Sequence, residues 1–444
     1  MRPLRIAVSG TLKELPASVL THLIDRRTAT DADVSRTVRD IIERVRSGGD
    51  AALRELAQTY DRTTVTELEV PREEWTSALG ALRPAVRDAM RHAAENIARV
   101  HNAWRPQRCG IEVEPGVHVQ RRPLPLDRVG VYAPGGRAAY ASSVFMGVIP
   151  ARVAGVREIV VCTPPTDNGR PNASVMAAAE IAGATRLFAV GGAGAIAAMA
   201  LGTASIPRVE CIVGPGNAWV TEAKRQLMRA VRTDAPAGPS EILIIADETA
   251  DLCAVAAELL AQAEHGADSA AVAVLIGTDL GSRLADVLAT VIPKLQRADI
   301  VHAALASRGA ILEAQSLDEA IAFADAYAPE HLMIATRDAA GLVYVPRNAG
   351  AVFIGATSSV AFGDYITGAN HVLPTAGHAR THSGLSTEMF MRWTTVQRVE
   401  PYAAKRLAPL ASLLAAAEGL DGHAVAAERA GAAMTRRAPN AAWP

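Results

Sequence analysis

The spacing of apolar residues changes along the chain, from a helical pattern to a strand-like one. Over residues 35–47, 50–60 and 84–100, apolar side chains recur every three or four positions, with arginine and glutamate between them. This spacing predicts amphipathic helices. Residues 64–70 are β-prone and predict a short strand between the second and third helix. We expect residues 1–30 to form a separate N-terminal helical segment.

From about residue 129, short apolar runs that end in glycine, proline or threonine alternate with helical stretches. The runs predict strands at 157–163, 186–191 and 209–214, and the helices after them span 172–182, 193–203 and 218–231. The alternation restarts with strands at 240–247, 270–277, 331–336 and 349–354 and a helix at 252–265. Strict alternation predicts parallel sheets that are covered by helices on both faces.

The predicted fold class is therefore α/β, with two Rossmann-like parallel-sheet domains that separate near residues 237–239. We expect residues 31–131 together with 240–383 to form a first, discontinuous domain, and residues 132–239 to form the second. Residues 384–444 are rich in alanine and arginine and predict a helical C-terminal tail without strands. Such a tail either packs on a partner subunit in a dimer or is a solvated appendage.

Composition narrows the class of protein. The chain has 444 residues, of which 50% are hydrophobic, so it can bury a large core. Its 45 basic and 46 acidic residues give a net charge of -1, which argues against nucleic acid or a membrane surface as partner. The four cysteines lie far apart without a CxxC pair, which favours a reducing compartment, the cytosol.

One uncharged stretch, residues 187–206, has the twenty residues that a membrane-spanning helix needs. It has two glycines near its start and Thr-Ala-Ser near its end, so we interpret it as a buried strand, a glycine turn and a buried helix. The N-terminus lacks the apolar segment of a secretory signal. We expect no membrane association.

The same stretch carries a candidate cofactor motif. Residues 192–197 match G-x-G-x-x-A between a predicted strand and a predicted helix, and Glu210 follows eighteen positions after the first glycine. This fits pyrophosphate binding at a helix N-terminus, although close packing of the helix explains the glycines equally well. Glycine- and proline-containing turns at 133–136, 214–217 and 237–240 also lie at strand ends, where open α/β sheets bind ligands.

Side chains that can bind a metal occur in three segments, each in a loop or at a helix end: Gln262 with His265, Asp364 with His371, and Glu418 with His423. Two histidines, an aspartate and a neutral oxygen ligand suit a catalytic zinc. Unrelated surface residues explain the same pattern.

Glu330 and His331 are neighbours at the start of a predicted strand. Adjacent side chains on an extended segment face opposite sides, so one can face a cleft while the other is held in place. The two residues suit an acid/base pair, and the alternative is a salt-bridging glutamate beside an edge histidine.

Eight sequence blocks together resemble the histidinol dehydrogenase family and occur in that family's order, from about residue 38 to about residue 429. The blocks are VGVYAPGG, SSVFMGVIPARVAGV, GPGNAWVTEAKR, AGPSEILIIAD, LLAQAEHG, YAPEHL, NHVLPT with SGLS, and AAEGLDGHA. The family consists of zinc- and NAD-dependent enzymes that complete histidine biosynthesis.

The resemblance implies a role for each matching residue. It implies one Zn2+ per subunit, bound by Gln262, His265, Asp364 and, across a homodimer interface, His423. It implies acid/base catalysis by Glu330 and His331. The implied substrate contacts are Ser240, Gln262, His265, His331, Asp364, His371, Glu418 and His423, and the implied NAD+ contacts are Tyr132, Gly194 and Asn217.

The resemblance also implies the reaction: oxidation of L-histidinol through L-histidinal to L-histidine, with two NAD+ reduced in sequence. Zinc would hold the imidazole and amine of the substrate and so fix the alcohol carbon against the nicotinamide. His331 would take the hydroxyl proton, and Glu330 would activate water for attack on the aldehyde.

One residue departs from the family's cofactor turn, which reads Gly-Gly-Ala-Gln-Ala-Ile. Gly194 stands where the glutamine belongs, and a lost amide hydrogen bond costs about 1 kcal/mol. We therefore expect weaker NAD+ binding and keep two alternatives. One is a relative that oxidises another small alcohol, such as a sulfopropanediol. The other is a zinc-bound structural or sensory protein, against which the presence of both Glu330 and His331 argues.

Overall fold

The computed structural model describes residues 4–26, 32–135, 140–236 and 238–433. Contacts group the chain into two units. Unit 1 comprises residues 1–105 and 126–390, and unit 2 comprises residues 106–125 and 391–444. In the described part of the chain, no helix is both long enough and apolar enough to cross a membrane.

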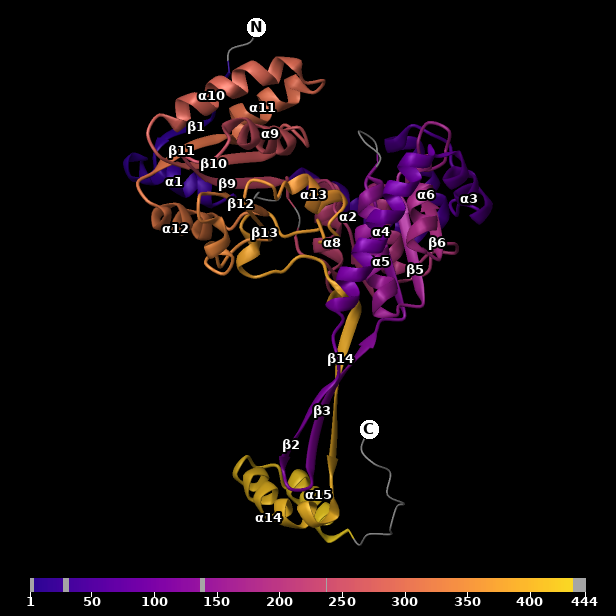
Figure 1. Cartoon of the computed structure of the whole chain (residues 1–444). Coiled ribbons are helices and arrows are strands. Elements are labelled where there is room, and N and C mark those ends of the chain that lie inside the picture. The colour runs from indigo at the N-terminus through magenta and orange to yellow at the C-terminus, as the bar shows by residue number, and fades with distance from the viewer. Residues whose placement is uncertain (1–3, 27–31, 136–139, 237, 434–444) are drawn as a thin grey trace. The chain divides into compact units, whose positions relative to one another are not determined.

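Unit 1 contains two parallel sheets that are visible in Figure 1. Within the described residues, the first sheet has the strand order β1-β11-β10-β9-β12-β13. Its strands are β1 (Val8–Thr11), β9 (Glu241–Asp247), β10 (Ala270–Ile276), β11 (Ala310–Ala314), β12 (His331–Ala335) and β13 (Ala351–Ile354). All pairs are parallel.

The side chains of β9 alternate between two hydrophobic clusters, one on each face of the first sheet. Ile242 and Ile244 pack with the helices α9 (Leu252–Ala263), α10 (Leu280–Val291) and α11 (Ala298–Arg308). Leu243 and Ile245 pack with α1 (Ala17–Ile24) and α12 (Leu317–Tyr327) on the other face. Burial on both faces explains why the strand is an unbroken apolar run.

The second sheet has the order β6-β5-β4-β7-β8, with all pairs parallel. Its strands are β4 (Arg128–Tyr132), β5 (Glu158–Thr163), β6 (Arg186–Ala189), β7 (Cys211–Val213) and β8 (Arg232–Thr233). The helices of this part of unit 1 are α2 (Ala32–Leu56), α3 (Arg72–Ala81), α4 (Pro84–Ala103), α5 (Ala141–Ala154), α6 (Ala173–Ala182), α7 (Gly192–Leu201) and α8 (Ala218–Leu227). The uncharged stretch 187–206 thus forms the predicted strand, turn and helix.

Both sheets share one topology. Numbered from β4 and from β9, each has the order 3-2-1-4-5 of a doubly wound nucleotide-binding fold, and β1 is added at the edge of the first. The predicted α/β fold class with two parallel sheets is confirmed. The strand β4, which the expected division assigns to the first domain, pairs within the second sheet.

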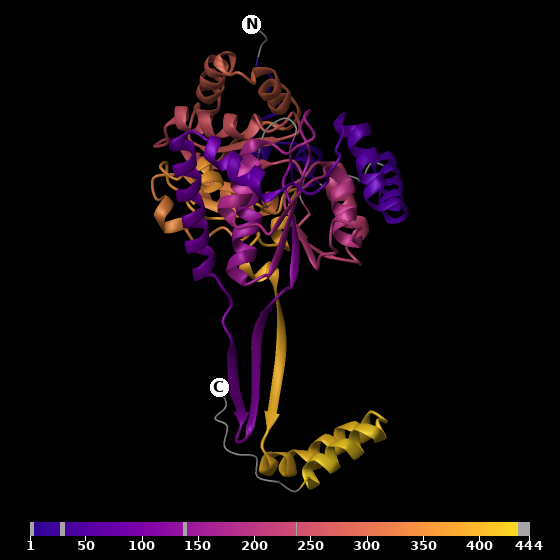
Figure 2. The ribbon, with the colours of Figure 1, turned by 90° about the vertical axis from the view of Figure 1, so that its right-hand side faces the viewer.

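Unit 2 contains a three-stranded antiparallel sheet in the order β14-β3-β2. Its elements are β2 (Cys109–Glu114), β3 (Val117–Pro125), β14 (Met391–Val399), α14 (Pro401–Ala417) and α15 (Asp421–Ala432). Figure 2 shows the three long strands side by side. The prediction of a tail without strands is wrong at β14. Most of its side chains are exposed or half-buried, so neither face shows the apolar alternation that identifies a strand.

Three further differences lie near the N-terminus. Residues 8–11, which we expect to be helical, form the strand β1 instead, and this strand pairs with β11. The two helices predicted over 35–60 are joined in α2, which is interrupted at Gly49 (φ 51°). The strand predicted at 64–70 is wrong: the segment forms one isolated bridge, from Glu69 to Phe188.

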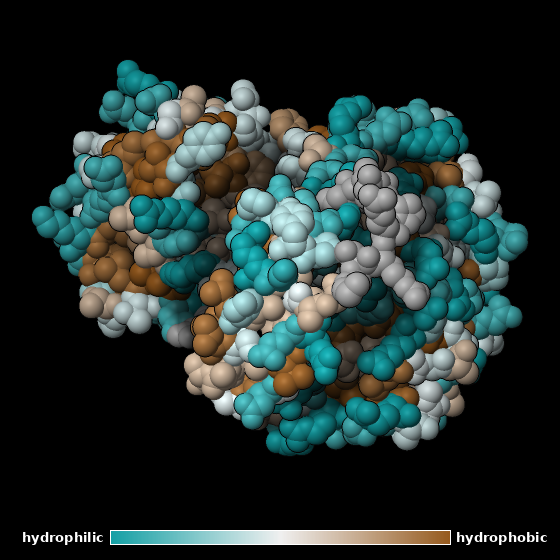
Figure 3. Space-filling view, turned by 90° about the horizontal axis from the view of Figure 1, so that it is seen from below, coloured by the Kyte–Doolittle hydropathy of each residue, from teal (hydrophilic) through white to brown (hydrophobic). Residues whose placement is uncertain are grey.

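Short helical segments complete the chain: residues 12–14, 57–61, 292–294, 339–342, 378–380 and 387–390, together with α13 (Val360–Tyr365). Figure 3 shows one face of the molecule, on which hydrophilic side chains surround scattered hydrophobic patches.

Candidate active site

The candidate acid/base pair lies at the amino-terminal edge of the first sheet. β9 and β12 are neighbouring parallel strands, and their pairing begins at His331 and Ile242. Glu241, Glu330 and His331 therefore gather where these two strands begin. The strand order of the sheet reverses between these two strands, but the pair lies at their amino-terminal ends and not at the carboxyl ends, where nucleotide-binding folds hold their ligands. The turn 237–240 precedes β9 and so lies at the same edge; Ala237 itself, like Gly136 of the turn 133–136, is outside the described residues.

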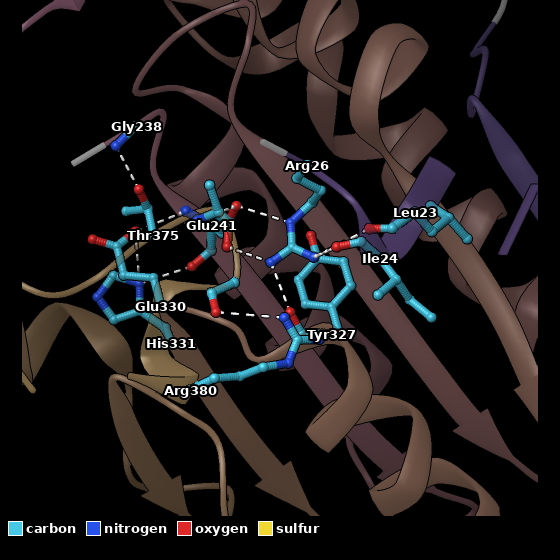
Figure 4. A network of polar contacts seen from close by, with 12 residues as sticks. Leu23, Ile24, Arg26, Gly238, Glu241, Tyr327, Glu330, His331, Thr375 and Arg380 are labelled. Carbon is cyan, nitrogen blue, oxygen red and sulfur yellow. Dashed lines mark hydrogen bonds and ion pairs between the residues drawn. The ribbon is translucent and has the colours of Figure 1, made fainter. Parts of the chain in front are cut away.

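The main chain of Glu241 holds both members of the pair (Figure 4). Its N–H donates to Oε2 of Glu330 at 2.8 Å, and its carbonyl oxygen lies 2.9 Å from Nδ1 of His331. A carbonyl only accepts hydrogen bonds, so Nδ1 carries the proton and Nε2 of the neutral ring is the basic nitrogen. Among the described residues, Nε2 has no hydrogen-bond partner.

Burial sets the protonation of the pair. Both residues are 5% exposed. Burial raises the pKa of Glu330 well above its usual value, and the nearby carboxylates of Glu241 and Asp364 raise it further, against the hydrogen bond from the Glu241 N–H. Burial lowers the pKa of His331, which the charge of Asp364 opposes. The site thus holds a neutral imidazole beside a carboxyl group of raised pKa, an arrangement suited to proton transfer near neutral pH.

Two of the predicted metal ligands lie close to the same histidines. The charges of Asp364 and His265 both act on the pKa of His331 and on that of His371. Asp364 lies in α13, and its carbonyl oxygen accepts a hydrogen bond from Nδ1 of His371 at 3.0 Å. The structure therefore brings Asp364, His265, His331 and His371 together, although they come from three separate segments.

The donor atoms fit zinc. Gln262 lies in the last turn of α9 and is 3% exposed. The Nε2 of its amide has no hydrogen-bond partner among the described residues, and the amide oxygen is the atom that a metal would bind. His265 directs Nδ1 to the carbonyl oxygen of Ala261 at 3.0 Å, which fixes its tautomer and leaves Nε2 available to a metal. Asp364 adds a carboxylate, so nitrogen and oxygen donors of the kind that zinc prefers are present.

The predicted ligand set is not complete within unit 1. No cluster of three or more His, Cys, Asp or Glu placed to hold a metal occurs among the described residues. Of the four predicted ligands, unit 1 supplies the histidine His265, the aspartate Asp364 and the amide of Gln262. Glu418, at the end of α14, and His423, in α15, are exposed residues of unit 2. Their roles stay predictions.

The predicted NAD+ contacts lie at the carboxyl-terminal edge of the second sheet. Tyr132 ends β4, and its hydroxyl accepts a hydrogen bond from the N–H of Gly192 at 3.1 Å, which ties β4 to the start of α7. Burial raises the pKa of Tyr132 to about 12, so its hydroxyl stays neutral. Asn217 caps α8: its Oδ1 accepts from the N–H groups of residues 219 and 220.

Gly194 faces helix α2. A Cβ atom at this position would lie 3.1 Å from Cδ1 of Leu56 and 3.5 Å from Cδ2 of Leu53. These contacts support the explanation that Gly194, the middle glycine of the G-x-G-x-x-A motif, allows α7 to pack closely on α2. Glu210 does not complete a Rossmann fingerprint, because it precedes β7 at the opposite edge of the sheet and accepts from the N–H of Asp127. A role of Gly194 in NAD+ binding stays a prediction.

Sequence reasoning missed Glu241, whose main chain organises the pair. Its place beside Ser240 in the AGPSE block is the only local signal. It also missed Arg26, which binds the Glu241 side chain across 215 positions of sequence. Nothing near Arg26 in the sequence indicates that contact.

Comparison with known proteins identifies the family. The profile of histidinol dehydrogenase matches residues 24–430. The chain is 47% identical over 405 residues to the histidinol dehydrogenase of Methanothermobacter thermautotrophicus, covering 91% of this chain and 95% of that one. It is 42% identical over 399 residues to that of Vibrio parahaemolyticus, covering 89% and 91%.

A solved structure agrees with these sequence matches. The crystal structure of histidinol dehydrogenase from Elizabethkingia anophelis superposes with a TM-score of 0.91 at 34% identity, covering 97% of this chain and 99% of that one. The chain belongs to the histidinol dehydrogenase family.

Proposed function

We propose that the protein oxidises L-histidinol through L-histidinal to L-histidine and transfers one hydride to NAD+ in each step. The observation that carries the proposal is the buried pair Glu330 and His331, held by the main chain of one residue with the basic nitrogen left open. The family membership and the fold support the same reaction.

His331 acts first in this proposal. Its Nε2 takes the hydroxyl proton of histidinol as the alcohol carbon loses a hydride to NAD+, which gives the aldehyde. Because burial lowers the pKa of the imidazole, the ring is neutral and able to accept that proton at pH 7. The hydrogen bond from Nδ1 to the Glu241 carbonyl keeps the accepting nitrogen in place.

Glu330 acts in the second half. Its carboxylate takes a proton from water as the water oxygen bonds to the aldehyde carbon, which gives the anion of the hydrate. The hydrate anion loses a hydride to the second NAD+, and the carboxylic acid so formed releases its remaining hydroxyl proton to solvent and becomes the carboxylate. The raised pKa of Glu330 makes its ionised form a stronger base than an exposed glutamate.

When bound, zinc would orient the amine and imidazole of the substrate. The residues that would hold it are Gln262, His265, Asp364 and His423 of the partner subunit of a homodimer. Ser240, His371 and Glu418 are the further proposed substrate contacts, and Tyr132, Gly194 and Asn217 the proposed NAD+ contacts. An exposed apolar stripe on α14, with Leu410, Leu413 and Leu414 between 58% and 70% exposed, supports a subunit interface in unit 2.

We further propose that the enzyme works in a reducing compartment, the cytosol. All four cysteines are free. The alternative of another small alcohol as substrate depends on Gly194. That position faces two leucines of α2, so no observation favours the alternative.

The test is a spectrophotometric assay. Zinc-loaded protein is mixed with NAD+ and L-histidinol, beside a panel of other small alcohols that includes a sulfopropanediol. We expect two NADH per histidinol and L-histidine as product. The control is the double variant Glu330→Gln with His331→Asn, which should bind the ligands without turnover. NADH formation with another alcohol and none with histidinol would overturn the proposal.

A further inference from the structure

A buried ion pair next to the candidate site involves Arg26, at the end of the N-terminal segment. Nε and Nη2 of Arg26 donate to Oε1 and Oε2 of Glu241, both at 2.9 Å. Both side chains are almost fully buried, with 5% and 4% of their surface exposed. This two-pronged geometry is the one in which a guanidinium and a carboxylate bind most specifically.

Arg26 also binds the segment that carries the acid/base pair. Its Nη2 donates to the carbonyl oxygen of Tyr327 at 2.9 Å, and its guanidinium carbon lies 3.3 Å from the centre of the Tyr327 ring. Tyr327 precedes Glu330 by three residues. The remaining nitrogen, Nη1, donates to the carbonyl oxygens of Leu23 and Ile24 at the end of α1.

Glu241 extends the network to the loop after His371. Its Oε1 accepts from the N–H of Ala376 at 3.0 Å, in addition to Arg26. Three segments therefore meet at one buried guanidinium and its carboxylate: the start of β9, the turn between α12 and β12, and the loop around residue 376. Figure 4 shows Arg26 between Glu241 and Tyr327, with Glu330 and His331 on the far side of Glu241.

We propose that Arg26 is a positioning residue for the acid/base pair. This inference rests on the proposed function. Arg26 fixes the side chain of Glu241 and the carbonyl of Tyr327, and Glu241 in turn directs its own N–H to Glu330 and its carbonyl oxygen to His331. The hydrogen bonds of the guanidinium go to Glu241, Tyr327, Leu23 and Ile24 and not to Glu330 or His331, so it acts on the pair through these contacts.

Loss of the guanidinium has a defined consequence. The Glu241 carboxylate would remain buried without its counter-charge, which is strongly unfavourable, so the start of β9 would move until the carboxylate gains water or another donor. That movement displaces the two main-chain groups that hold the pair. A lysine at position 26 keeps the charge but cannot make the two-pronged contact together with the bonds to Tyr327, Leu23 and Ile24.

The experiment compares Arg26→Met and Arg26→Lys with a matched control. Arg186 has the same kinds of contact elsewhere in unit 1. It binds Glu69 with two nitrogens, donates to the carbonyl oxygen of Ser205 at 2.9 Å and lies over the Phe188 ring. Arg186→Met thus loses an ion pair of the same geometry away from the acid/base pair, at a more exposed position, with 29% of the Arg186 side chain and 44% of the Glu69 side chain exposed. All variants are assayed well below their melting temperatures, which are measured in parallel.

We expect kcat of Arg26→Met to fall about 100-fold, because a small displacement of catalytic groups has an effect of this size. KM for histidinol should change less than kcat, and zinc content should change little, since neither Arg26 nor Glu241 is hydrogen-bonded to Gln262, His265 or Asp364. Arg26→Lys should lie between Arg26→Met and the wild type. Arg186→Met should keep kcat within about twofold of wild type, as expected for a loss of stability alone. Added methylguanidinium should restore part of kcat in Arg26→Met and none in Arg186→Met.

Two outcomes overturn the inference: a kcat of Arg26→Met equal to that of Arg186→Met, or a loss confined to KM. If Arg26→Met does not fold, the kcat values of Arg26→Lys and Glu241→Gln are compared with that of the wild type instead. A wild-type kcat in both variants overturns the inference. An inactive wild type would instead refute the proposed function. An active wild type with unaffected Arg26 variants refutes the positioning role alone.

Discussion

The Nε2 atom of His331 lies 3.8 Å from Oδ1 of Asp364, a predicted metal ligand. The two atoms are too far apart for a hydrogen bond. Nε2 therefore has no hydrogen-bond partner among the described residues. The basic nitrogen of the site is therefore directed to the carboxylate that we expect to bind zinc. The nitrogen that would accept the substrate's proton thus lies beside a carboxylate that would bind the metal, and the two groups are not hydrogen-bonded to each other.

The first prediction concerns His331→Asn. Alcohol oxidation should fall by about 10²- to 10⁴-fold, the usual contribution of a general base, because asparagine cannot accept the hydroxyl proton. Zinc content, measured by atomic spectroscopy on dialysed protein, should stay at the wild-type level. His22→Asn, at an exposed position of α1, is the control. An equal loss of zinc and of activity would make His331 a structural residue.

The second prediction concerns Glu330→Gln. The amide keeps an oxygen that can accept the hydrogen bond from the Glu241 N–H, so the local fold should be retained. Water activation is lost, so oxidation of supplied L-histidinal should fall by about 10²-fold or more, while the first NADH from histidinol still forms. Stopped-flow absorbance, with a carbonyl trap for the aldehyde, separates the two steps. An unchanged rate with supplied aldehyde would remove Glu330 from this role.

How far the sequence could predict the structure depends on where each residue's partners lie. The strands β9 and β12 are buried on both faces, so their apolar runs identify them without further information. β14 has no buried face and is held by its pairing with β3, which lies more than 250 residues earlier in the chain. The local pattern of apolar and polar residues cannot indicate a partner that lies so far away in the sequence.

The residues of the candidate site also differ in whether their partners are close or distant in the sequence. Glu330 and His331 are recognisable because they are adjacent at the start of a buried strand. The tautomer of His331 depends on Glu241, ninety positions away, and the place of Glu241 depends on Arg26, a further 215 positions away. The candidate metal ligands lie in loops and at helix ends far apart in the sequence, where only the family resemblance unites them as one set.

The third prediction concerns Gly194→Gln, which introduces the residue typical of the family. Because a Cβ atom here would lie 3.1 Å from Leu56, the added amide would be directed to α2 and not to the cofactor, so we expect KM for NAD+ not to fall below the wild-type value. Gly194→Ala is the control for the added Cβ alone. A several-fold lower KM in Gly194→Gln only would show that the missing amide weakens NAD+ binding.

The fourth prediction concerns the partner subunit. If His423 completes the site of the other protomer, His265→Ala and His423→Ala should each be inactive alone. A random mixture of the two, after dissociation and reassociation, should recover about a quarter of wild-type activity, because half of the dimers are mixed and each holds one intact site. Mixing His265→Ala with Asp364→Ala is the control and should recover nothing. Failure of the first mixture, with exchange verified by mass spectrometry, would place all ligands on one chain.

The fifth prediction concerns His101, which lies in α4 away from the candidate acid/base pair. The side chain is fully buried, its Nε2 has no partner among the described residues, and the Trp104 ring lies edge-on to it at 5.4 Å. Burial lowers its pKa from 6.5 to about 4. The native state therefore keeps His101 neutral at pH values at which the unfolded chain protonates it.

This difference makes stability depend on pH with a defined sign. The unfolded state binds the extra proton between pH 6.5 and about 4, so the free energy of unfolding falls as the pH is lowered through this window, by about 3 kcal/mol for this group alone. His101→Leu fills a similar volume and cannot protonate. Urea unfolding at pH 7.5, 6 and 5 should show a smaller loss of stability on acidification in His101→Leu than in the wild type, while His22→Asn follows the wild type. Parallel curves for His101→Leu and wild type would mean that His101 protonates equally in the folded and unfolded states.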